Sequence, residues 1–296
     1  MIIADMTGYF RNFSTDEDCR KYLINKFWKN GPVCPYCKNT ERIYAYKSRP
    51  IHKCPECKNQ FTITTGTIFA NSRIPLHKLF LAYYLISINK KGVSSTHLGR
   101  ALGISQKAAW YLAHKIRSGL KRTSNKKLSN TVEVDETYIG GRKRGFAYKG
   151  RSTANKTPVF GMIERKGELI IMPVIDTKRK TLEPIILGFV EKGTKVMSDE
   201  WWAYTKLARY YKHQMVKHRA REYVRGNVHT NSIEGAWSQL KKAINGTHHR
   251  PSRKHLGKYC DEFAFKFNNR NDKDFERFEK AIATSKFLIH QKHITN

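Results

Sequence analysis

Four of the six cysteines fall into two pairs, and their spacing constrains the fold of the N-terminal region more than any other feature of the chain. The pairs, Cys34-Pro-Tyr-Cys37 and Cys54-Pro-Glu-Cys57, are separated by residues 38–53. Two thiolates in one tight turn face a single ion, and four sulfurs complete the tetrahedral shell of Zn²⁺. Strand-like stretches at 42–47 and 60–65 accompany the pairs. The sequence therefore predicts a zinc ribbon that holds one structural Zn²⁺, with two disulfides or a redox-active pair as alternatives.

Two short helices joined by a tight turn are predicted after the ribbon. A serine pair at 94–95 can cap the first helix, Gly103 ends it, and Ser105 caps the second. This arrangement is the signature of a helix-turn-helix, in which the second helix enters the major groove of DNA. Gln106 and Lys107 begin that helix and are the predicted base-reading residues, whereas an ordinary helical hairpin is the alternative.

The charge of the chain indicates a polyanionic partner. The sequence holds 56 Lys and Arg against 24 Asp and Glu, a formal net charge of +32, and both halves of the chain are basic. Phosphate backbones compensate such a surplus by releasing counterions, so nucleic acid is the predicted partner, with DNA and RNA both open at this point. No apolar window of 18 residues and no secretory signal are visible, so we expect a cytoplasmic, nucleoid-associated protein without a membrane partner.

From residue 131 onward, the pattern predicts an α/β domain. Three consecutive strands followed by alternating helices and strands are typical of a mixed sheet flanked by helices. The expected strands lie at 131–139, 158–163, 168–175, 194–198 and 213–217, and the expected helices at 182–190, 200–210, 231–246 and 253–269. The predicted organisation is an N-terminal helical segment at 1–30, the zinc ribbon at 31–70, the helix-turn-helix region at 71–120, a linker at 121–130, the α/β domain at 131–275 and a C-terminal tail at 276–296.

Three acidic residues in apolar surroundings are the candidate catalytic groups. Asp135 lies on the first strand of the α/β domain, Asp199 directly follows the fourth strand, and Glu234 opens the helix at 231–246. A carboxylate on a central strand is costly to bury unless a cation compensates it. Oxygen ligands from two neighbouring strands and a helix start are suited to two Mg²⁺ ions about 3.5–4 Å apart, the arrangement that supports phosphoryl transfer.

Each of these carboxylates also has a structural alternative. Glu133 and Glu136 lie on the same strand and are alternative ligands if Asp135 is solvated. Asp199 is alternatively no more than the N-cap of a following helix. Glu234 lies at the position of the acidic partner in a capping box. From the residue pattern alone, these alternatives remain open.

The order of the motifs resembles that of the DDE transposases of bacterial insertion sequences, specifically the ISXO-like group related to the eukaryotic Merlin elements. The matching stretches are Val134-Asp-Glu-Thr-Tyr-Ile-Gly-Gly141, Ser198-Asp-Glu-Trp-Trp-Ala-Tyr204 and His229-Thr-Asn-Ser-Ile-Glu-Gly-Ala-Trp-Ser-Gln-Leu-Lys-Lys242. The resemblance implies a ribonuclease H-like catalytic fold, a catalytic triad made of the three acids, and two catalytic Mg²⁺ or Mn²⁺ ions. It also implies that a homo-oligomer binds double-stranded DNA, at the terminal inverted repeats of its element and in target DNA, within a synaptic complex.

Basic residues near the motifs are predicted to contact DNA. The segment between the first two strands, 140–157, has six Lys and Arg and no acid, which is typical of a loop that meets phosphate. The predicted contacts within it are Arg142, Lys143 and Arg144. Transposases of this kind often carry a basic DNA contact two helical turns after the third acid, which indicates Lys241 and its neighbour Lys242.

Two polar residues beside the third acid are supporting candidates. His229 and Asn231 are predicted to orient Glu234 or to contact DNA, and loop and cap roles are their alternatives. The basic cluster at 248–253 is expected to bind phosphate rather than metal. The leading hypothesis is a DNA transposase that cleaves and transfers strands. The alternatives are a DNA-binding regulator without catalysis and a ribonuclease H-like nuclease.

Overall fold

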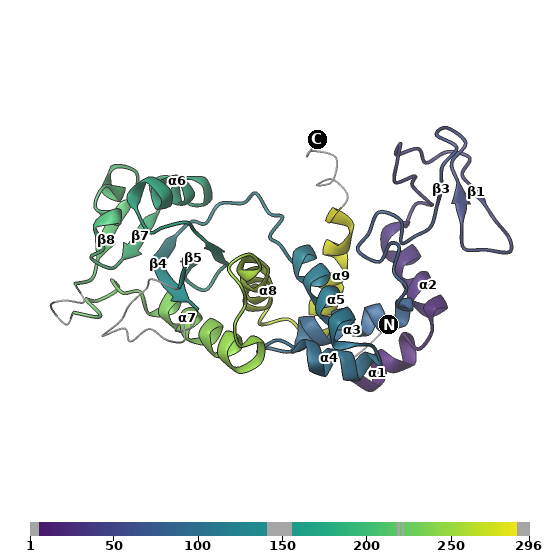
Figure 1. Cartoon of the computed structure of the whole chain (residues 1–296). Coiled ribbons are helices and arrows are strands. Elements are labelled where there is room, and N and C mark those ends of the chain that lie inside the picture. Colours follow the sequence, from purple (N-terminus) through teal and green to yellow (C-terminus); the bar gives the residue numbers. More distant parts are fainter. Residues whose placement is uncertain (1–5, 141–155, 218–219, 221, 289–296) are drawn as a thin grey trace. The chain divides into compact units, whose positions relative to one another are not determined.

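The computed structural model describes residues 6–140, 156–217, 220 and 222–288, and the chain divides into two compact units (Figure 1). The first unit comprises residues 1–89, 95–120 and 271–296, and the second comprises residues 90–94 and 121–270. Within the described ranges, no helix combines the length and the apolar composition that crossing a bilayer requires.

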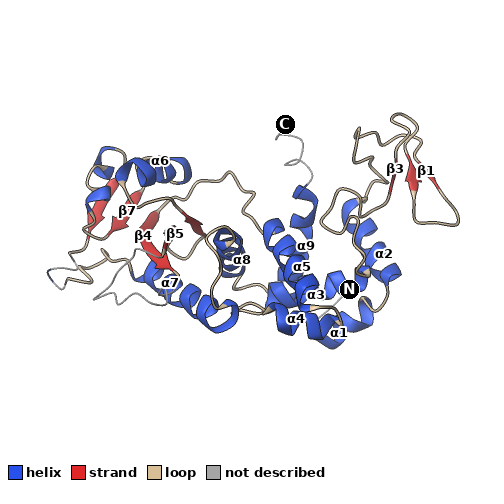
Figure 2. Cartoon of the chain, in the orientation of Figure 1, coloured by secondary structure: helices blue, strands red, loops and turns tan. Residues whose placement is uncertain are grey.

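Helices and one small sheet make up the first unit (Figure 2). Its helices are α1 (Met6–Asn12), α2 (Asp16–Phe27), α3 (Leu76–Ile88), α4 (Ser95–Leu102), α5 (Gln106–Gly119) and α9 (Asp274–Thr284), which the 3₁₀ turn η5 (Ser285–Leu288) follows. Its antiparallel sheet has the order β1 (Tyr44–Ala45), β2 (His52–Lys53) and β3 (Gln60–Phe61). The predicted zinc ribbon therefore has its strands, although they are shorter than the sequence suggested.

The core of the first unit is an aromatic cluster centred on Phe278 of α9. The ring centroids of Tyr9, Phe13 and Tyr84 each lie 5.8 Å from that of Phe278, and the ring of Phe80 lies 5.9 Å away. Residues of α1, the loop after it and α3 thus enclose a side chain from the end of the chain. The sequence analysis predicted a C-terminal tail here, because the residues that pack against Phe278 lie far away in the sequence, in α1, the loop after it and α3.

A five-stranded mixed sheet forms the centre of the second unit. Its order is β6 (Leu169–Pro173), β5 (Thr157–Glu164), β4 (Thr131–Ile139), β7 (Lys195–Ser198) and β8 (Lys212–Met215). The pairs β6–β5 and β5–β4 are antiparallel, whereas β4–β7 and β7–β8 are parallel. This topology confirms the predicted α/β class, and it is the sheet expected of a ribonuclease H-like domain.

Helices cover both faces of this sheet. The helices of the second unit are α6 (Arg179–Phe189), α7 (Asn231–Ala243), which continues into the π-helix η4 (Ile244–His248), and α8 (Leu256–Asn268). Val132 and Val134 of β4 pack on one face with α6, whereas Ile139 packs on the other face with α7 and α8. Side chains alternate along a strand, so Asp135 points to the α7 face.

The helix predicted at residues 200–210 is absent, and this expectation was wrong. Two 3₁₀ turns, η1 (Trp202–Tyr204) and η2 (Leu207–Arg209), occupy the segment. The side chain of Asp199 accepts a hydrogen bond from the Trp201 amide at 3.0 Å. This bond is that of an N-cap, which does not itself oppose a helix. The indole of Trp201 donates to the carbonyl of Thr177, a contact outside the segment.

Candidate functional site

The sheet register brings Asp135 and Asp199 together. In the parallel pairing of β4 with β7, Thr131 lies opposite Lys195 and Glu133 lies opposite Met197. Continuing this register by two residues places Asp199, just beyond the end of β7, beside Asp135. Two acids that are 64 positions apart in sequence therefore meet at one edge of the sheet, as the sequence predicted.

A tryptophan of α7 and a glycine of β5 form the immediate surroundings of Asp135. Asp135 pairs across the sheet with Gly161, and the indole N–H of Trp237 donates to Asp135 Oδ2 at 2.9 Å. A Cβ atom at position 161 would lie only 2.5 Å from the Trp237 ring. Glycine is therefore required for the indole to lie flat against the sheet and reach the carboxylate.

Negative charge is concentrated at this edge. Burial, together with the charges of Glu136 and Asp199, holds the pKa of Asp135 well above its usual range. Burial raises the pKa of Glu136 to about 7, against the hydrogen bond that the buried Tyr204 hydroxyl donates to it at 2.5 Å. Acids crowded in this way are stabilised by a cation that lies between them.

Glu234 lies on the first turn of α7, three residues before Trp237. Residues three apart share one helix face, so Glu234 is on the side of α7 from which Trp237 reaches Asp135. Its side chain is exposed, and it accepts a hydrogen bond from the hydroxyl of Thr230, the N-cap, at 2.8 Å. The alternative in which Glu234 forms a capping box with Asn231 does not describe this helix start.

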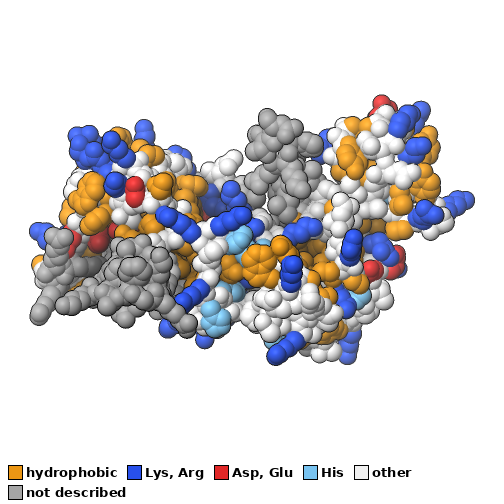
Figure 3. Space-filling view, in the orientation of Figure 1, with side chains coloured by type: hydrophobic (Ala, Val, Ile, Leu, Met, Phe, Trp, Pro, Cys, Tyr) orange, Lys and Arg blue, Asp and Glu red, His pale blue; other side chains and the backbone are white. Residues whose placement is uncertain are grey.

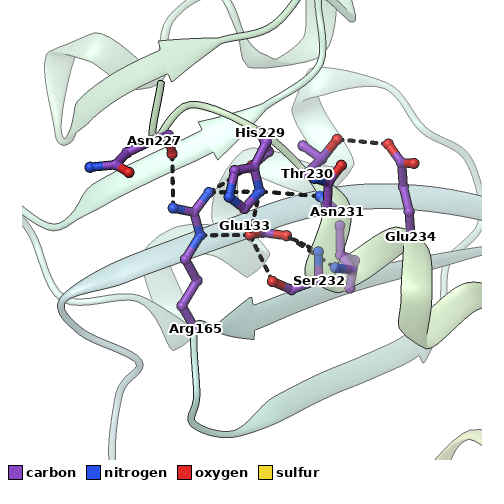
Figure 4. A network of polar contacts seen from close by, with 9 residues as sticks. Glu133, Arg165, Asn227, His229, Thr230, Asn231, Ser232 and Glu234 are labelled. Atoms are coloured by element: carbon purple, nitrogen blue, oxygen red, sulfur yellow. Dashed lines mark hydrogen bonds and ion pairs between the residues drawn. The ribbon is translucent and has the colours of Figure 1, made fainter. Parts of the chain in front are cut away.

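The N-terminus of α7 is capped instead by a carboxylate from the sheet (Figure 4). Glu133, which is fully buried, accepts hydrogen bonds from the amides of Ser232 and Ile233 at 2.8 and 3.0 Å. Its other oxygen accepts the Ser232 hydroxyl at 2.9 Å and the Arg165 Nε at 2.7 Å. Glu133 therefore fixes the start of α7 on β4, two residues from Asp135.

Arg165 completes this network from the turn after β5. Its guanidinium donates to the carbonyl of Asn227 at 2.8 Å and to the carbonyl of His229 at 2.9 Å, besides its bond to Glu133 (Figure 4). The His229 ring lies 3.4 Å from Glu133 through Nδ1. His229 thus contacts the network that holds α7, while Asn231 lies exposed at the helix start.

The contacts of the three acids differ from one another. Both oxygens of Glu133 are engaged by the start of α7 and by Arg165, so Glu133 serves the fold. Asp135 is held by Trp237 in a largely buried place rather than solvated. Asp199 accepts the hydrogen bond of a local cap, and its charge also raises the pKa of Asp135 and of Glu136.

The donor set at this edge fits a hard divalent cation, which prefers carboxylate oxygens. Asp135 and Asp199 are the two acids that the register brings together, whereas Glu234 is exposed on α7 and bonded to Thr230. Within the described ranges, the only group of three or more potential ligands with donor atoms within 4.8 Å of one another is formed by cysteines. The three carboxylates therefore do not form such a group in this structure.

That cysteine group is the predicted zinc site: Cys34, Cys37, Cys54 and Cys57. Facing sulfurs lie 3.6 Å apart for Cys34 and Cys57 and 3.5 Å apart for the other two. Sulfurs about 2.3 Å from a tetrahedral centre are about 3.8 Å from one another, so the cluster fits Zn²⁺. All four are free thiols, which contradicts the disulfide alternative.

Removing zinc is expected to unfold the ribbon alone. The full chain should carry about one zinc, and Cys54→Ser or a chelator should expose residues 31–65 to protease, because ligand binding supplies the folding energy of such sites. The second unit should stay protected, because its two cores are separate from the cluster of Cys34, Cys54 and Phe61. Cys260→Ser, which changes a buried thiol of α8, is the control and should keep its zinc. A stoichiometry near zero in the parent protein would contradict the site.

The helix-turn-helix forms as predicted. Gly103 has a φ of +64° between α4 and α5, and the Ser105 hydroxyl accepts a hydrogen bond from the Ala108 amide at 3.2 Å. Gln106 and Lys107 are exposed, and the Gln106 amide donates to Ser95 at 2.8 Å. Arg117, a basic flank of this motif in the sequence, is buried and is therefore not available to DNA.

Substitution of Gln106 or Lys107 by alanine is expected to weaken binding to the element's own end more than binding to random duplex. Side chains at the start of a recognition helix reach base edges, and each good contact contributes about 1–3 kcal/mol of discrimination. Fluorescence anisotropy with both duplexes at one salt concentration measures the ratio. Lys91→Ala, which removes an exposed cation from the loop before the motif, is the control. Equal losses on both duplexes would make these residues phosphate contacts.

The remaining predicted DNA contacts divide between described and undescribed parts of the chain. Lys241 and Lys242 lie exposed in the last turn of α7. Arg142, Lys143 and Arg144 lie outside the described residues. Lys and Arg side chains are spread over both units on the face shown in Figure 3, where Asp and Glu are few.

Sequence reasoning missed several residues that shape the site. Trp237, Gly161 and Arg165 lie in contact with the candidate carboxylates or their support. Only Trp237 had a local signal, because it lies three residues after Glu234 on the same helix face. For Gly161, only the pairing register shows which residue it adjoins.

Comparison with known proteins gives two matching family models. Residues 127–268 match the ISXO2-like transposase domain, and residues 14–60 match the transposase zinc-ribbon domain. The chain is also 27% identical, over 273 residues, to an uncharacterised protein in the transposable element ISH50 of Halobacterium salinarum. That alignment covers 86% of this chain and 91% of the relative.

Among solved structures, two Mos1 complexes share a distant likeness. A pre-cleavage Mos1 transpososome is 12% identical with a TM-score of 0.31, covering 94% of this chain and 96% of its own. A Mos1 paired-end complex with the left transposon end is 14% identical with a TM-score of 0.29, covering 70% and 78%. At such TM-scores the likeness adds nothing to the sequence matches.

Proposed function

The chain belongs to the ISXO2-like transposases with an N-terminal zinc ribbon, and from this premise we propose that Asp135, Asp199 and Glu234 perform its strand cleavage and strand transfer. The observation that carries the proposal is the parallel register of β4 with β7, which, continued by two residues, puts Asp199 beside Asp135, where burial and the charges of Glu136 and Asp199 raise the pKa of Asp135. A DNA transposase is a phosphoryl transferase, and it needs a site that gathers oxygen ligands in this way.

Mg²⁺ is the cation that we propose for this edge. When bound, a pair of such ions activates the attacking oxygen and stabilises the leaving oxygen of an in-line displacement. Trp237 fixes Asp135 by donating to one of its oxygens. Tyr204 holds Glu136, the next residue of β4, on the α6 face of the sheet. Glu133 and Arg165 keep α7 at the distance from β4 that Glu234 needs to close the site.

The reaction balances without a further co-substrate. In cleavage, a water oxygen forms a bond to phosphorus, the bond to the 3′-oxygen breaks, and that oxygen leaves as a hydroxyl. In strand transfer, the freed 3′-hydroxyl attacks a phosphorus of target DNA, and again one P–O bond replaces another. Joining both ends of an element uses more than one active site, so we propose that copies of the chain assemble when two ends are paired.

We assign the recognition of the element's terminal repeats to the first unit. It carries the exposed Gln106 and Lys107 on α5 and the zinc ribbon, whereas the second unit carries the carboxylates. The test uses the full chain, Mg²⁺ and a labelled duplex that spans the boundary of the element with its flanking DNA. A nick at that boundary is expected. Tight end binding without any nick would favour a regulator, and nicking without preference for the boundary would favour a general nuclease.

A further inference from the structure

A cationic pocket lies in the second unit, beyond the end of β4. Its volume is about 500 Å³, and its basic lining consists of the cations Lys156, Arg250 and Arg253 and the imidazole of His249. No acid is among the residues that line it, and no carboxylate of the described ranges forms an ion pair with these four. Such a pocket attracts an anionic group.

The lining also has an apolar component. Ile139 and Ile244, both almost fully buried, and Pro251 contribute to it, and the amide of Asn245 adds a group with both donors and an acceptor. The volume far exceeds that of a phosphate ion and falls within the range of small-molecule sites, about 300–1,000 Å³. A nucleotide within a strand, with a phosphate on either side, an apolar sugar edge and a hydrogen-bonding base, matches these three kinds of lining.

The backbone around the pocket departs from regular structure. Helix α7 passes into the π-helix η4, and His249 then adopts a φ of +58°, a left-handed conformation that non-glycine residues rarely occupy. This turn carries His249 and Arg250 into the pocket lining. Strained residues and π-helical turns persist where the surrounding structure over-determines them, and they are frequent at binding sites.

The distance from the pocket to the candidate carboxylates follows from two elements that connect them, β4 and the helix formed by α7 and η4. Ile139 lies four residues after Asp135 on β4, which at about 3.3 Å per residue is about 13 Å. Ile244 lies ten residues after Glu234 along α7 and η4, which at about 1.5 Å per residue is about 15 Å. Both routes agree. Along one strand of duplex DNA, at about 3.4 Å per nucleotide, this distance corresponds to about four nucleotides.

We infer that this pocket binds one nucleotide of the DNA strand that passes the carboxylates, about four nucleotides from the reacting phosphate. This inference rests on the proposed function in one respect, that a DNA strand passes the carboxylates. A nucleotide that enters a pocket has left the base stack, so the bound strand is locally unpaired there. The cations neutralise its phosphates, and the apolar wall and Asn245 contact the sugar and the base.

The test measures binding without Mg²⁺, so that its outcome is independent of cleavage. The full chain, its Arg250→Gln/Arg253→Gln variant and a control variant, Arg209→Gln/Lys212→Gln, bind a fluorescent 20-nucleotide oligodeoxythymidine at several NaCl concentrations. The control removes the same charge from two exposed residues, Arg209 at the end of η2 and Lys212 at the start of β8, the end of the strand opposite to Asp199. Two lost phosphate contacts should reduce the magnitude of the log–log salt slope by about 1.4 in the pocket variant. An unchanged slope, or an equal reduction in the control, would overturn the inference.

A second strand distinguishes a nucleotide from a phosphate alone. In the same assay, an abasic oligonucleotide of equal length keeps every phosphate but lacks the bases. The parent chain should prefer oligodeoxythymidine over the abasic strand, and this preference should shrink at least threefold in the pocket variant while it persists in the control. The same preference in all three proteins would show that the pocket takes phosphate only, and the nucleotide assignment would then be wrong.

Discussion

Replacing Asp135 by asparagine is expected to lower Mg²⁺-dependent strand cleavage by about a thousandfold while end binding stays nearly intact. Asparagine keeps the size of the side chain and can still accept the Trp237 indole N–H, but it removes the charge that holds the cation. Metal activation contributes several kcal/mol to the transition state, and each 1.36 kcal/mol is about tenfold in rate. Single-turnover nicking of a labelled element end measures the loss.

The thermal stability of Asp135→Asn shows whether a loss of cleavage comes from a lost metal ligand or from unfolding. Burial and the charges of Glu136 and Asp199 raise the pKa of Asp135 in the folded chain, so the ionised form opposes folding at neutral pH. Because the pKa is raised, the folded state binds more protons than the unfolded state at a pH between the two pKa values of Asp135. The free energy of unfolding therefore falls as the pH rises from the pKa in the unfolded chain to the pKa in the folded chain. Asparagine removes that opposition. The thermal midpoint of Asp135→Asn should therefore equal or exceed that of the parent at pH 7.

Three matched variants complete the experiment. Asp199→Asn should behave as Asp135→Asn does, and Glu234→Gln should also abolish cleavage if it closes the site. Glu191→Gln changes an exposed acid after α6 and should retain full activity. Parental nicking by Asp135→Asn would exclude this carboxylate as a ligand. Full activity in Glu234→Gln alone would leave a site with two carboxylates.

Glu133→Ala is expected to destabilise the second unit by about 3–5 kcal/mol, because it leaves Arg165 and the first amides of α7 without their partner. The carboxylate is fully buried and accepts from Arg165, Ser232 and Ile233, so its loss affects both the ion pair and the helix cap. Chemical denaturation followed by the tryptophan signal measures the change. Arg165→Ala should cost a similar amount, since it leaves Glu133 buried with no cation.

A surface ion pair provides the control for this prediction. Arg179 and Glu183 lie one helical turn apart on α6 with 3.5 Å between charged atoms, and Glu183→Gln should change stability by about 0.5 kcal/mol or less. A loss of under 1 kcal/mol in Glu133→Ala would mean that water or another donor replaces its contacts. The start of α7 would then not depend on the sheet.

Local patterns were sufficient for much of the fold. The expected strand at 131–139 is β4 to the residue, and Ser105 caps α5 through its hydroxyl as the helix-turn-helix signal predicted. Cysteine spacing determined the zinc site because each pair sits within one turn. These features depend on residues close in sequence, for which propensity and spacing carry enough information.

Long-range contacts account for what the sequence did not show. Glu133 and Asp135 are equivalent acids on one face of a strand, and only the bond from Ser232, 99 positions away, shows that Glu133 serves a helix. The apolar face of α9 likewise has no local partner. At residues 200–210 two 3₁₀ turns replace the expected helix, and the indole of Trp201 donates to Thr177, a contact that no local pattern shows.

The packing of α9 has a consequence for the order in which the protein matures on the ribosome. Synthesis as far as residue 270 yields the whole of the second unit, yet the first unit still lacks Phe278 at the centre of its aromatic cluster. Glu279 is also still missing at that stage, and in the complete chain it accepts hydrogen bonds from Tyr22 and Lys26 at 2.8 and 3.3 Å. The part of the chain made first is therefore completed last, and a chain that ends before α9 has its whole second unit but an incomplete first unit.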